Sequence, residues 1–261
     1  MKIQLLSDLH LEFDPPELPI ISQEADVIIY AGDVSSRKDL ALDYFKNVRK
    51  ETEAKILYVL GNHEFYGKFL HSGSVYKHIL REVPNLDVLD RDALLYQGVR
   101  FIGCTLWTDF DDRRSESAAR LGMSDYVKIR KMGKYYNTEY IDTVDILNEH
   151  YKCRDFLREE FYHASFSSYP VVVITHHSPS FYCVPEGRRG HPMNGAFYVE
   201  LSDLMIAHKP ALWLYGHTHE VHRTTIGDTE LLCNSWGYPF ESHRNMSPVI
   251  VGVSNVSAKD K

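Results

Sequence analysis

The stretch Ile3-Gln4-Leu5-Leu6-Ser7-Asp8-Leu9-His10 decides the fold. Its apolar first half predicts a short buried strand, and Asp8 and His10 follow that strand directly. In an open α/β sheet, side chains just past the carboxyl end of a strand face the crevice in which ligands bind. Asp8 and His10 can therefore offer a carboxylate oxygen and an imidazole nitrogen to one cation. Asp-x-His alone is a weak signal, and its weight comes from later segments of the same design.

Four further apolar runs end in polar residues. The runs 25–31, 55–60, 170–175 and 211–215 lead into Gly32-Asp33, Gly61-Asn62-His63-Glu64, His176-His177 and Gly216-His217-Thr218-His219. Helices are expected over 37–50, about 69–82 and about 195–208, between these runs. Alternating strands and helices predict a parallel sheet, which brings the strand ends to one edge. About eight oxygen and nitrogen donors should converge there.

The remaining segments are less regular. Short runs from Leu86 to Gly103 suggest an antiparallel meander, and the stretches 220–226, 229–234 and 247–253 suggest antiparallel edge strands. Residues 108–168 hold the least regular part, with one long helix expected at about 138–164. The prediction is a single domain over residues 1–261, with a cap-like insertion at about 108–168 over the crevice.

The bulk composition excludes several classes of protein. The net charge of -7 argues against broad electrostatic binding to nucleic acid or to anionic membranes. No apolar run is long enough to cross a bilayer, and the first predicted strand leaves no room for a signal peptide. Four cysteines without C-x-x-C spacing indicate scattered buried thiols. We therefore expect a cytoplasmic protein without a membrane partner.

The donor types indicate which metals would fit. Imidazole and carboxylate ligands without thiolate favour Mn, Fe, Zn, Ni or Co over soft ions. Eight donors exceed the need of one tetrahedral ion but suit a pair that shares a carboxylate. The sequence thus predicts two divalent or trivalent metal ions per chain.

In their order, these five segments resemble the five motif blocks of the calcineurin-like metallophosphoesterases. The resemblance covers the chain except residues 108–168, and it implies an α/β fold, a four-layer α/β/β/α sandwich with mixed sheets. It also implies the roles of the site residues. One metal would be bound by Asp8, His10 and His219, the other by Asn62, His176 and His217. Asp33 would bridge the two, and His63 would be the non-ligating acid beside the leaving group.

One block departs from the family's protein phosphatases, which read Gly-Asp-x-x-Asp-Arg there. This chain reads Gly32-Asp33-Val34-Ser35-Ser36-Arg37, so Ser36 replaces the carboxylate that orients the catalytic histidine, while Arg37 remains. This weakens the case for a phosphoprotein phosphatase. It also leaves the partner of His63 unidentified, since Glu64 is poorly placed for that role.

Substrate contacts are expected in the irregular segment and in the loop after His177. Residues 113–134 carry seven basic and two acidic side chains. The default interpretation is a solvated helix face, and the alternative is a basic surface that binds further phosphates. Alternation along the strand makes His177 either a support of a neighbouring ligand or a structural residue. His191 and His222 are expected to be ordinary surface residues, with an approach to the crevice as the alternative. The candidate substrate-binding residues are Arg37, Arg130, Arg188, Arg189 and Asn194.

The predicted function is hydrolysis of a phosphomonoester or phosphodiester by in-line attack of a hydroxide that bridges two metal ions, with a phosphate-ester small molecule as the expected substrate. The rival enzymatic interpretation is a nuclease of the same family, which the charge balance disfavours. The third is a non-catalytic scaffold on this fold, which would be expected to have lost ligands. The sequence leaves open the natural substrate, the native metal and the oligomeric state.

Overall fold

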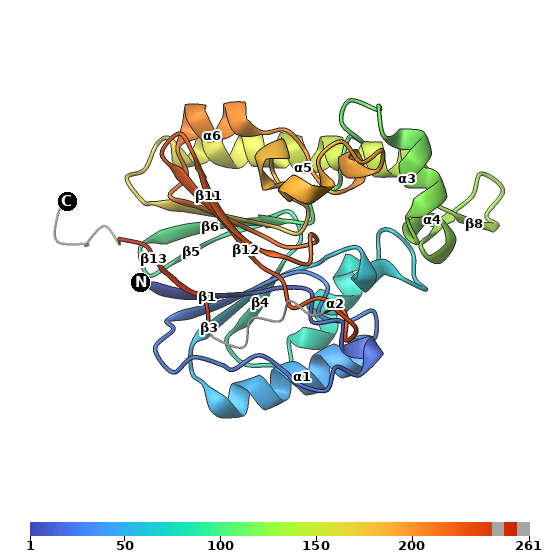
Figure 1. Cartoon of the computed structure of the whole chain (residues 1–261). Helices are drawn as coiled ribbons and strands as arrows, with labels where there is room; N and C mark the ends of the chain where they lie inside the picture. Colours follow the sequence, from blue (N-terminus) through green and yellow to red (C-terminus); the bar gives the residue numbers. More distant parts are fainter. Residues whose placement is uncertain (242–247, 255–261) are drawn as a thin grey trace.

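Two mixed β-sheets pack face to face in the computed structural model, which describes residues 1–241 and 248–254 (Figure 1). The first sheet has the strand order β13-β1-β2-β3-β4, and the second has the order β11-β12-β10-β9-β6-β5. A two-stranded ribbon, β7-β8, stands apart from both. The strands are β1 (Lys2–Leu6), β2 (Val27–Ala31), β3 (Lys55–Val59), β4 (Leu86–Leu89), β5 (Asp92–Tyr96), β6 (Val99–Cys104), β7 (Arg130–Met132), β8 (Thr138–Tyr140), β9 (Val171–Thr175), β10 (Leu212–Tyr215), β11 (Val221–Ile226), β12 (Thr229–Asn234) and β13 (Ile250–Gly252).

Helices cover the two outer faces of this pair of sheets. The α-helices are α1 (Lys38–Glu51), α2 (Gly73–Leu80), α3 (Glu116–Gly122), α4 (Asp125–Lys128), α5 (Thr143–Ala164) and α6 (Ser202–His208). The 3-10 helices are η1 (Leu11–Phe13), η2 (His63–Phe65), η3 (Phe181–Cys183), η4 (Glu186–Arg188) and η5 (Asn194–Ala196). Figure 1 shows α1 and α2 below the first sheet and α5 and α6 above the second. The predicted four-layer α/β/β/α sandwich with mixed sheets is confirmed.

The strands read as continuous apolar runs because both of their faces are covered. On β2, Val27 and Ile29 belong to the core between the sheets, whereas Ile28 and Tyr30 belong to the core under the helices. All four side chains are fully buried. Such strands lie deep in the sandwich and hold the loops at their ends in place.

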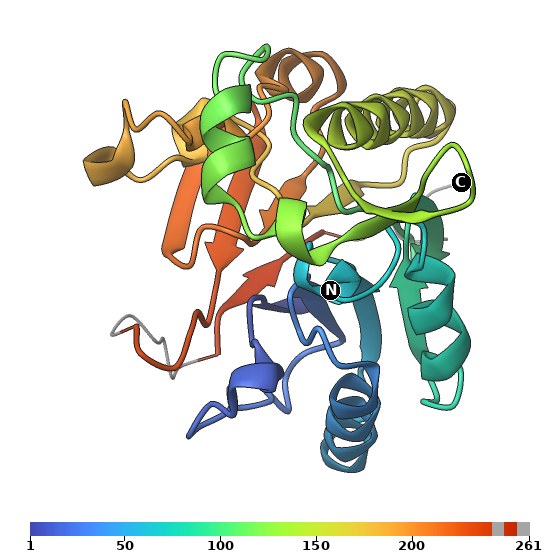
Figure 2. The same cartoon turned by 90° about the vertical axis from the view of Figure 1, so that its right-hand side faces the viewer.

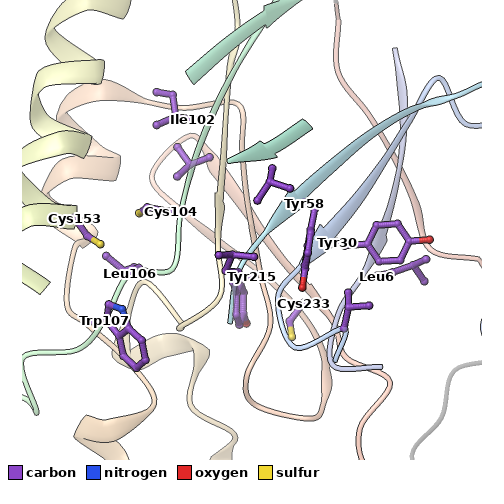
Figure 3. Packing of buried hydrophobic residues seen from close by; sticks show 14 of the residues in the cluster. Leu6, Tyr30, Tyr58, Ile102, Cys104, Leu106, Trp107, Cys153, Tyr215 and Cys233 are labelled. Atoms are coloured by element: carbon purple, nitrogen blue, oxygen red, sulfur yellow. The ribbon is translucent and has the colours of Figure 1, made fainter. Parts of the chain in front are cut away.

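The second sheet is joined to its helices in the same way (Figure 3). Cys104 on β6 and Cys153 on α5 lie side by side where the helix crosses the sheet. The Phe161 ring of α5 stacks on His208, with their centroids 4.8 Å apart. All four cysteines are free and buried, as predicted.

The strand ends converge from two sheets and not from the edge of one, which corrects the single parallel sheet of the sequence interpretation. β1, β2 and β3 lie in the first sheet, and β9 and β10 lie in the second. Both sets run parallel with their carboxyl ends on the same side of the sandwich. Periodicity identifies a buried strand but says nothing about which sheet it joins.

Several expected elements differ in extent or pairing. The meander from Leu86 is wrong: β4 pairs parallel with β3, and only β5 and β6 form a hairpin. Of the three expected antiparallel edge strands, β11 and β13 are confirmed, whereas β12 is internal and also pairs parallel with β10. Residue 247, the first of the expected last strand, lies outside the described residues. The helices expected near 69–82 and 195–208 shorten to α2 and α6, the latter preceded by η5.

The irregular segment 108–168 has two parts. The expected helix at 138–164 begins only at Thr143, because Asp142 forms a capping box there, and α5 then packs on β6 as part of the outer layer. The preceding helices α3 and α4 and the ribbon β7-β8 lie beyond the carboxyl ends of the strands (Figure 2). Among the described residues, no helix is both long enough and apolar enough to span a bilayer.

Candidate metal centre

One group of donor side chains gathers where β1 and β10 end. Asp8 and His10 follow β1, and His219 lies four residues past β10. The Nε2 atoms of His10 and His219 face each other at 3.0 Å, and Asp8 Oδ1 lies 3.6 Å from His219 Nε2. His219 Nδ1 donates to the Glu241 carboxylate at 2.8 Å, which leaves the lone pair on Nε2. Such a set of atoms fits one shared cation.

A second group lies beside the first. His176 Nδ1 donates to the backbone carbonyl of Ala31 at 2.8 Å, so that its Nε2 carries a lone pair. That nitrogen lies 3.0 Å from Asn62 Oδ1 and 3.1 Å from His217 Nδ1. His217 is buried, and its Nε2 has no hydrogen-bond partner among the described residues. A cation held by the two facing ring nitrogens would satisfy lone pairs that otherwise oppose each other.

Asp33 connects the two groups. Its Oδ2 lies 3.4 Å from His176 Nε2 and 3.8 Å from His10 Nε2. Burial favours the neutral acid, yet His176 and His63 hold the pKa of Asp33 well below its usual range. The carboxylate is therefore ionised and central, as a bridging ligand must be. The structure thus brings together all seven residues predicted to bind metal: Asp8, His10, Asp33, Asn62, His176, His217 and His219.

The loops that carry these side chains have an unusual backbone. Asp8, His10, Asp33, His217 and His219 have φ values of 57°, 48°, 53°, 68° and 53°. Residues other than glycine rarely adopt this left-handed conformation, and it persists where surrounding structure enforces it, often at functional sites. The buried strands hold these loops in the left-handed conformation, so that the side chains of five donors point toward the same site.

Gly216 shows how closely the loops approach one another. A Cβ at this position would lie 1.9 Å from Ser7 Oγ and 2.8 Å from Asp8 Oδ2. We therefore expect Gly216→Ala to lower the free energy of unfolding by about 1–3 kcal/mol, the usual cost of overpacking. Urea denaturation of the metal-free protein measures this. Gly252→Ala is the control, because nothing lies within 4 Å of its Cβ position; an equal effect in both variants would contradict the close approach.

His63 lies at the edge of the two groups and is held by Glu12. Its Nδ1 donates to Glu12 Oε1 at 2.8 Å, and its Nε2 lies 3.1 Å from the Tyr238 hydroxyl. Burial lowers the pKa of His63, but Asp33 and Glu12 more than offset this and raise it above its usual value. The neighbouring carboxylates therefore favour the protonated ring, and the bond to Glu12 orients it, as a proton donor requires.

Glu12 takes the place of the carboxylate that the sequence lacks at position 36. It lies in η1, two residues after His10, and its Oε2 accepts a hydrogen bond from the Ser36 backbone amide at 3.1 Å. The carboxylate thus comes from the first loop and not from the second. Its only sequence signal is an acidic residue that closely follows the Asp-x-His pair.

Glu64 has a different role, as expected. Its carboxylate accepts from the backbone amides of Asp33, Ser35 and Gly61 at 3.0, 3.1 and 2.6 Å, and from the Tyr58 hydroxyl at 2.6 Å. Burial, and next Asp33, raise the pKa of Glu64 to about 7. Glu64 therefore ties the second and third loops together and does not touch His63 Nδ1.

A model of the calcineurin-like phosphoesterase family matches residues 1–221 of the chain. This chain belongs to the calcineurin-like phosphoesterases. It is 26% identical over 272 residues to an uncharacterized protein of Acanthamoeba polyphaga mimivirus, with 94% of each chain covered.

Solved structures of the family share the fold. Phosphopantetheinyl hydrolase from Mycobacterium tuberculosis has a TM-score of 0.67 at 16% identity, over 91% of this chain and 90% of that one. A dimetal phosphatase from Danio rerio has a TM-score of 0.51 at 14% identity, over 94% and 90%. At these identities the likeness concerns the fold alone.

In this phosphoesterase, the irregular segment contributes to the site through Asp125. The Asn62 amide donates to Asp125 Oδ1 at 2.9 Å and to the Tyr66 hydroxyl at 3.1 Å. Tyr66 in turn donates to Asp125 at 2.8 Å. These bonds fix the Asn62 amide so that its oxygen faces His176. Sequence reasoning missed Asp125, because nothing in the sequence places α4 beside β3.

Four donors of this phosphoesterase, Asp33, Asn62, His217 and His219, line a cleft of about 290 Å³ together with His63. Of the residues predicted to bind substrate, Arg188 lines this cleft and Asn194 lines a neighbouring cavity. The other three are not among the residues that line it. Arg37 pairs with Asp39, Arg130 belongs to the exposed ribbon, and Arg189 lies 5.7 Å from the Phe181 ring.

Two further predictions concern residues outside the donor groups. His177 is buried, its Nδ1 donates to the Thr105 carbonyl at 3.2 Å, and burial lowers its pKa to about 3, which fits a structural role. The basic segment 113–134 is mostly paired with acids, as a solvated face would be. Its ion pairs are Arg113–Glu116, Arg114–Asp111, Arg120–Asp142 and Lys131–Asp145.

Proposed function

We propose that this protein is a two-metal phosphoesterase that hydrolyses a phosphate ester by direct attack of water-derived hydroxide, without a phosphoenzyme. The observation that carries the proposal is the position of Asp33 between two groups of imidazole, carboxylate and amide donors. When bound, a pair of cations supplies an activated water and a clamp on the phosphoryl oxygens.

The donor set assigns the ligands. Asp8, His10 and His219 would hold one ion, and Asn62, His176 and His217 the other, with Asp33 shared. All are buried or nearly so, and the rings of His219 and His176 are oriented by bonds to Glu241 and to the Ala31 carbonyl. Imidazole and carboxylate donors suit Mn, Fe, Zn, Ni or Co.

The chain itself supplies the proton for the leaving group. His63 faces the cleft, its Nε2 lies 3.9 Å from Asp33 Oδ2, and Asp33 and Glu12 favour its cationic form. Donation from His63 Nε2 would neutralise the departing alkoxide, while Glu12 stabilises the cationic ring until transfer. The Tyr238 hydroxyl beside Nε2 marks where the leaving oxygen would lie.

Two rival functions receive less support. A nuclease would need free positive charge along a groove, and the basic segment is largely paired with acids. A scaffold would be expected to lack ligands, and all seven proposed ligands are present and converge. The names of the two structural relatives, a hydrolase and a dimetal phosphatase, agree with a catalytic protein.

Metal removal tests the proposal. We expect hydrolysis of p-nitrophenyl phosphate esters to fall to the background rate after chelation and dialysis, and to return on addition of Mn²⁺, because the proposed nucleophile is a water activated by the metal ions. Elemental analysis before and after dialysis should show about two metal ions per chain lost and regained. Activity that persists in metal-free protein, or a metal-loaded protein that hydrolyses no ester, would contradict it.

A further inference from the structure

A second cavity adjoins the cleft. This side pocket has a volume of about 310 Å³, and its walls include Val184, Pro185, Met193 and Phe197. It shares Met193, Phe197, Arg188 and Thr218 with the cleft, so the two cavities meet along these side chains. An apolar pocket that opens on a charged centre is the usual form of a site for the organic part of a polar ligand.

The size of the side pocket indicates what it can hold. An apolar cavity of about 150 Å³ accommodates benzene, and the side pocket is about twice as large. Thr218 lies between the proposed ligands His217 and His219, and the Phe197 ring is 4.9 Å from the His217 ring. A phosphoryl group at the donor groups would therefore place an aromatic or branched alkyl substituent in the side pocket.

The position of His63 indicates whether the group in the side pocket is the leaving group or the retained ester group. His63 lies beside His10, Glu12 and Tyr238, whereas Phe197 lies beside His217. Within the described chain, His63, Glu12, Tyr66 and Tyr238 are absent from the side-pocket lining. The leaving oxygen must be within reach of His63, so the group in the side pocket is on another ester oxygen.

We propose that the substrate is a phosphodiester whose retained ester arm is apolar and occupies the side pocket. This deepens the proposed function and rests on it. In the reaction, water loses one proton to solvent and its oxygen forms a bond to phosphorus, while the bond from phosphorus to the leaving oxygen breaks. The leaving alkoxide takes its proton from His63, which solvent then protonates again. The products are an alcohol and a phosphomonoester that keeps the apolar arm.

Three substrates with one leaving group test the proposal: p-nitrophenyl phosphate and its methyl and phenyl diesters, with Mn²⁺-loaded protein. We expect kcat/KM for the phenyl diester to exceed that for the methyl diester at least about tenfold, because a buried ring is worth more than a methyl group, and to exceed that for the monoester. Calorimetric binding of benzylphosphonate and methylphosphonate, which cannot lose an alcohol, should show the same ratio in Kd.

Charged variants test the location. Pro185 and His191 line the side pocket but not the cleft. Pro185→Glu, or the exposed His191→Glu if the first fails to fold, should abolish both the catalytic and the binding preference for the aromatic arm. Gly187→Glu is the matched control, because it adds the same charge to the same loop with nothing within 4 Å of its Cβ position.

The outcomes separate the two proposals. Equal or better hydrolysis of the methyl diester or the monoester would overturn the apolar arm and leave the phosphoesterase standing. A preference that survives in both charged variants would overturn the side pocket as its site. If no ester is hydrolysed, the proposed function fails, and the phosphonate affinities still decide whether an apolar arm binds there.

Discussion

Replacing Asp33 with asparagine is expected to lower kcat/KM at least about 1,000-fold, which corresponds to about 4 kcal/mol of transition-state stabilisation. The side chain lies 3.4 Å from His176 and 3.8 Å from His10, so its carboxylate lies beside an imidazole nitrogen of each donor group. An amide has the same shape but lacks the charge that holds two cations close together. Steady-state rates with Mn²⁺ and elemental analysis of the purified variant measure the effect.

The control for this substitution is Asp39→Asn. Asp39 is exposed in the first turn of α1 and pairs with Arg37, so its loss should change kcat/KM less than about twofold. Asp33 also accepts the backbone amide of His63 at 2.8 Å, and thermal unfolding therefore accompanies the rates. A folded Asp33→Asn protein that keeps two metal ions and more than a tenth of the activity would show that Asp33 is no bridge.

The donor groups were largely predictable from the sequence, because each donor directly follows a buried strand. The position of a residue relative to a strand end is a local property of the sequence, and it was enough to predict that Asp8, Asp33 and His176 face the site. The division of the donors between two metal ions could not be predicted from local sequence, and it came from the family resemblance. The structure brings the same sets together, although the strand ends belong to two sheets.

The residues that orient the donors were not predictable in this way. Glu12, Asp125 and Glu241 each act on a side chain far away in sequence, and each lies in a loop or a short helix without periodicity. The same is true of Tyr238. Contacts of this kind depend on how loops fold over the sheet edges, which local pattern does not determine.

The substrate-binding residues were predicted on other grounds. Arg37 and Arg130 were chosen for their charge and for their nearness in sequence to predicted site segments. In the structure Arg37 pairs with its neighbour Asp39, and Arg130 lies on an exposed ribbon. The side pocket beside the cleft is instead mostly apolar. Arg188 and Asn194, which were predicted, do line it, but its apolar walls have no signal of charge in the sequence.

Replacing Glu12 with glutamine is expected to slow the hydrolysis of esters with alkoxide leaving groups about 10–100-fold, the usual cost of losing a partner that orients a functional side chain. Esters of p-nitrophenol should slow less than about threefold, because a stable phenolate needs little help from an acid. The glutamine side chain can still accept a hydrogen bond from His63 Nδ1, so the imidazole ring keeps its position. The negative charge of Glu12, which stabilises the cationic ring, is lost. The ratio of the two rates is the measurement.

A double variant that combines Glu12→Gln with His63→Ala tests whether Glu12 acts through His63. If Glu12 acts through His63, adding Glu12→Gln to His63→Ala should cost no more than about twofold. Glu24→Gln is the control, since that carboxylate is exposed and pairs only with Lys2 among the contacts described. Glu12 Oε1 also lies 3.7 Å from His10 Nδ1. An equal loss on both leaving groups, together with lost metal, would therefore show that Glu12 supports His10 instead of His63.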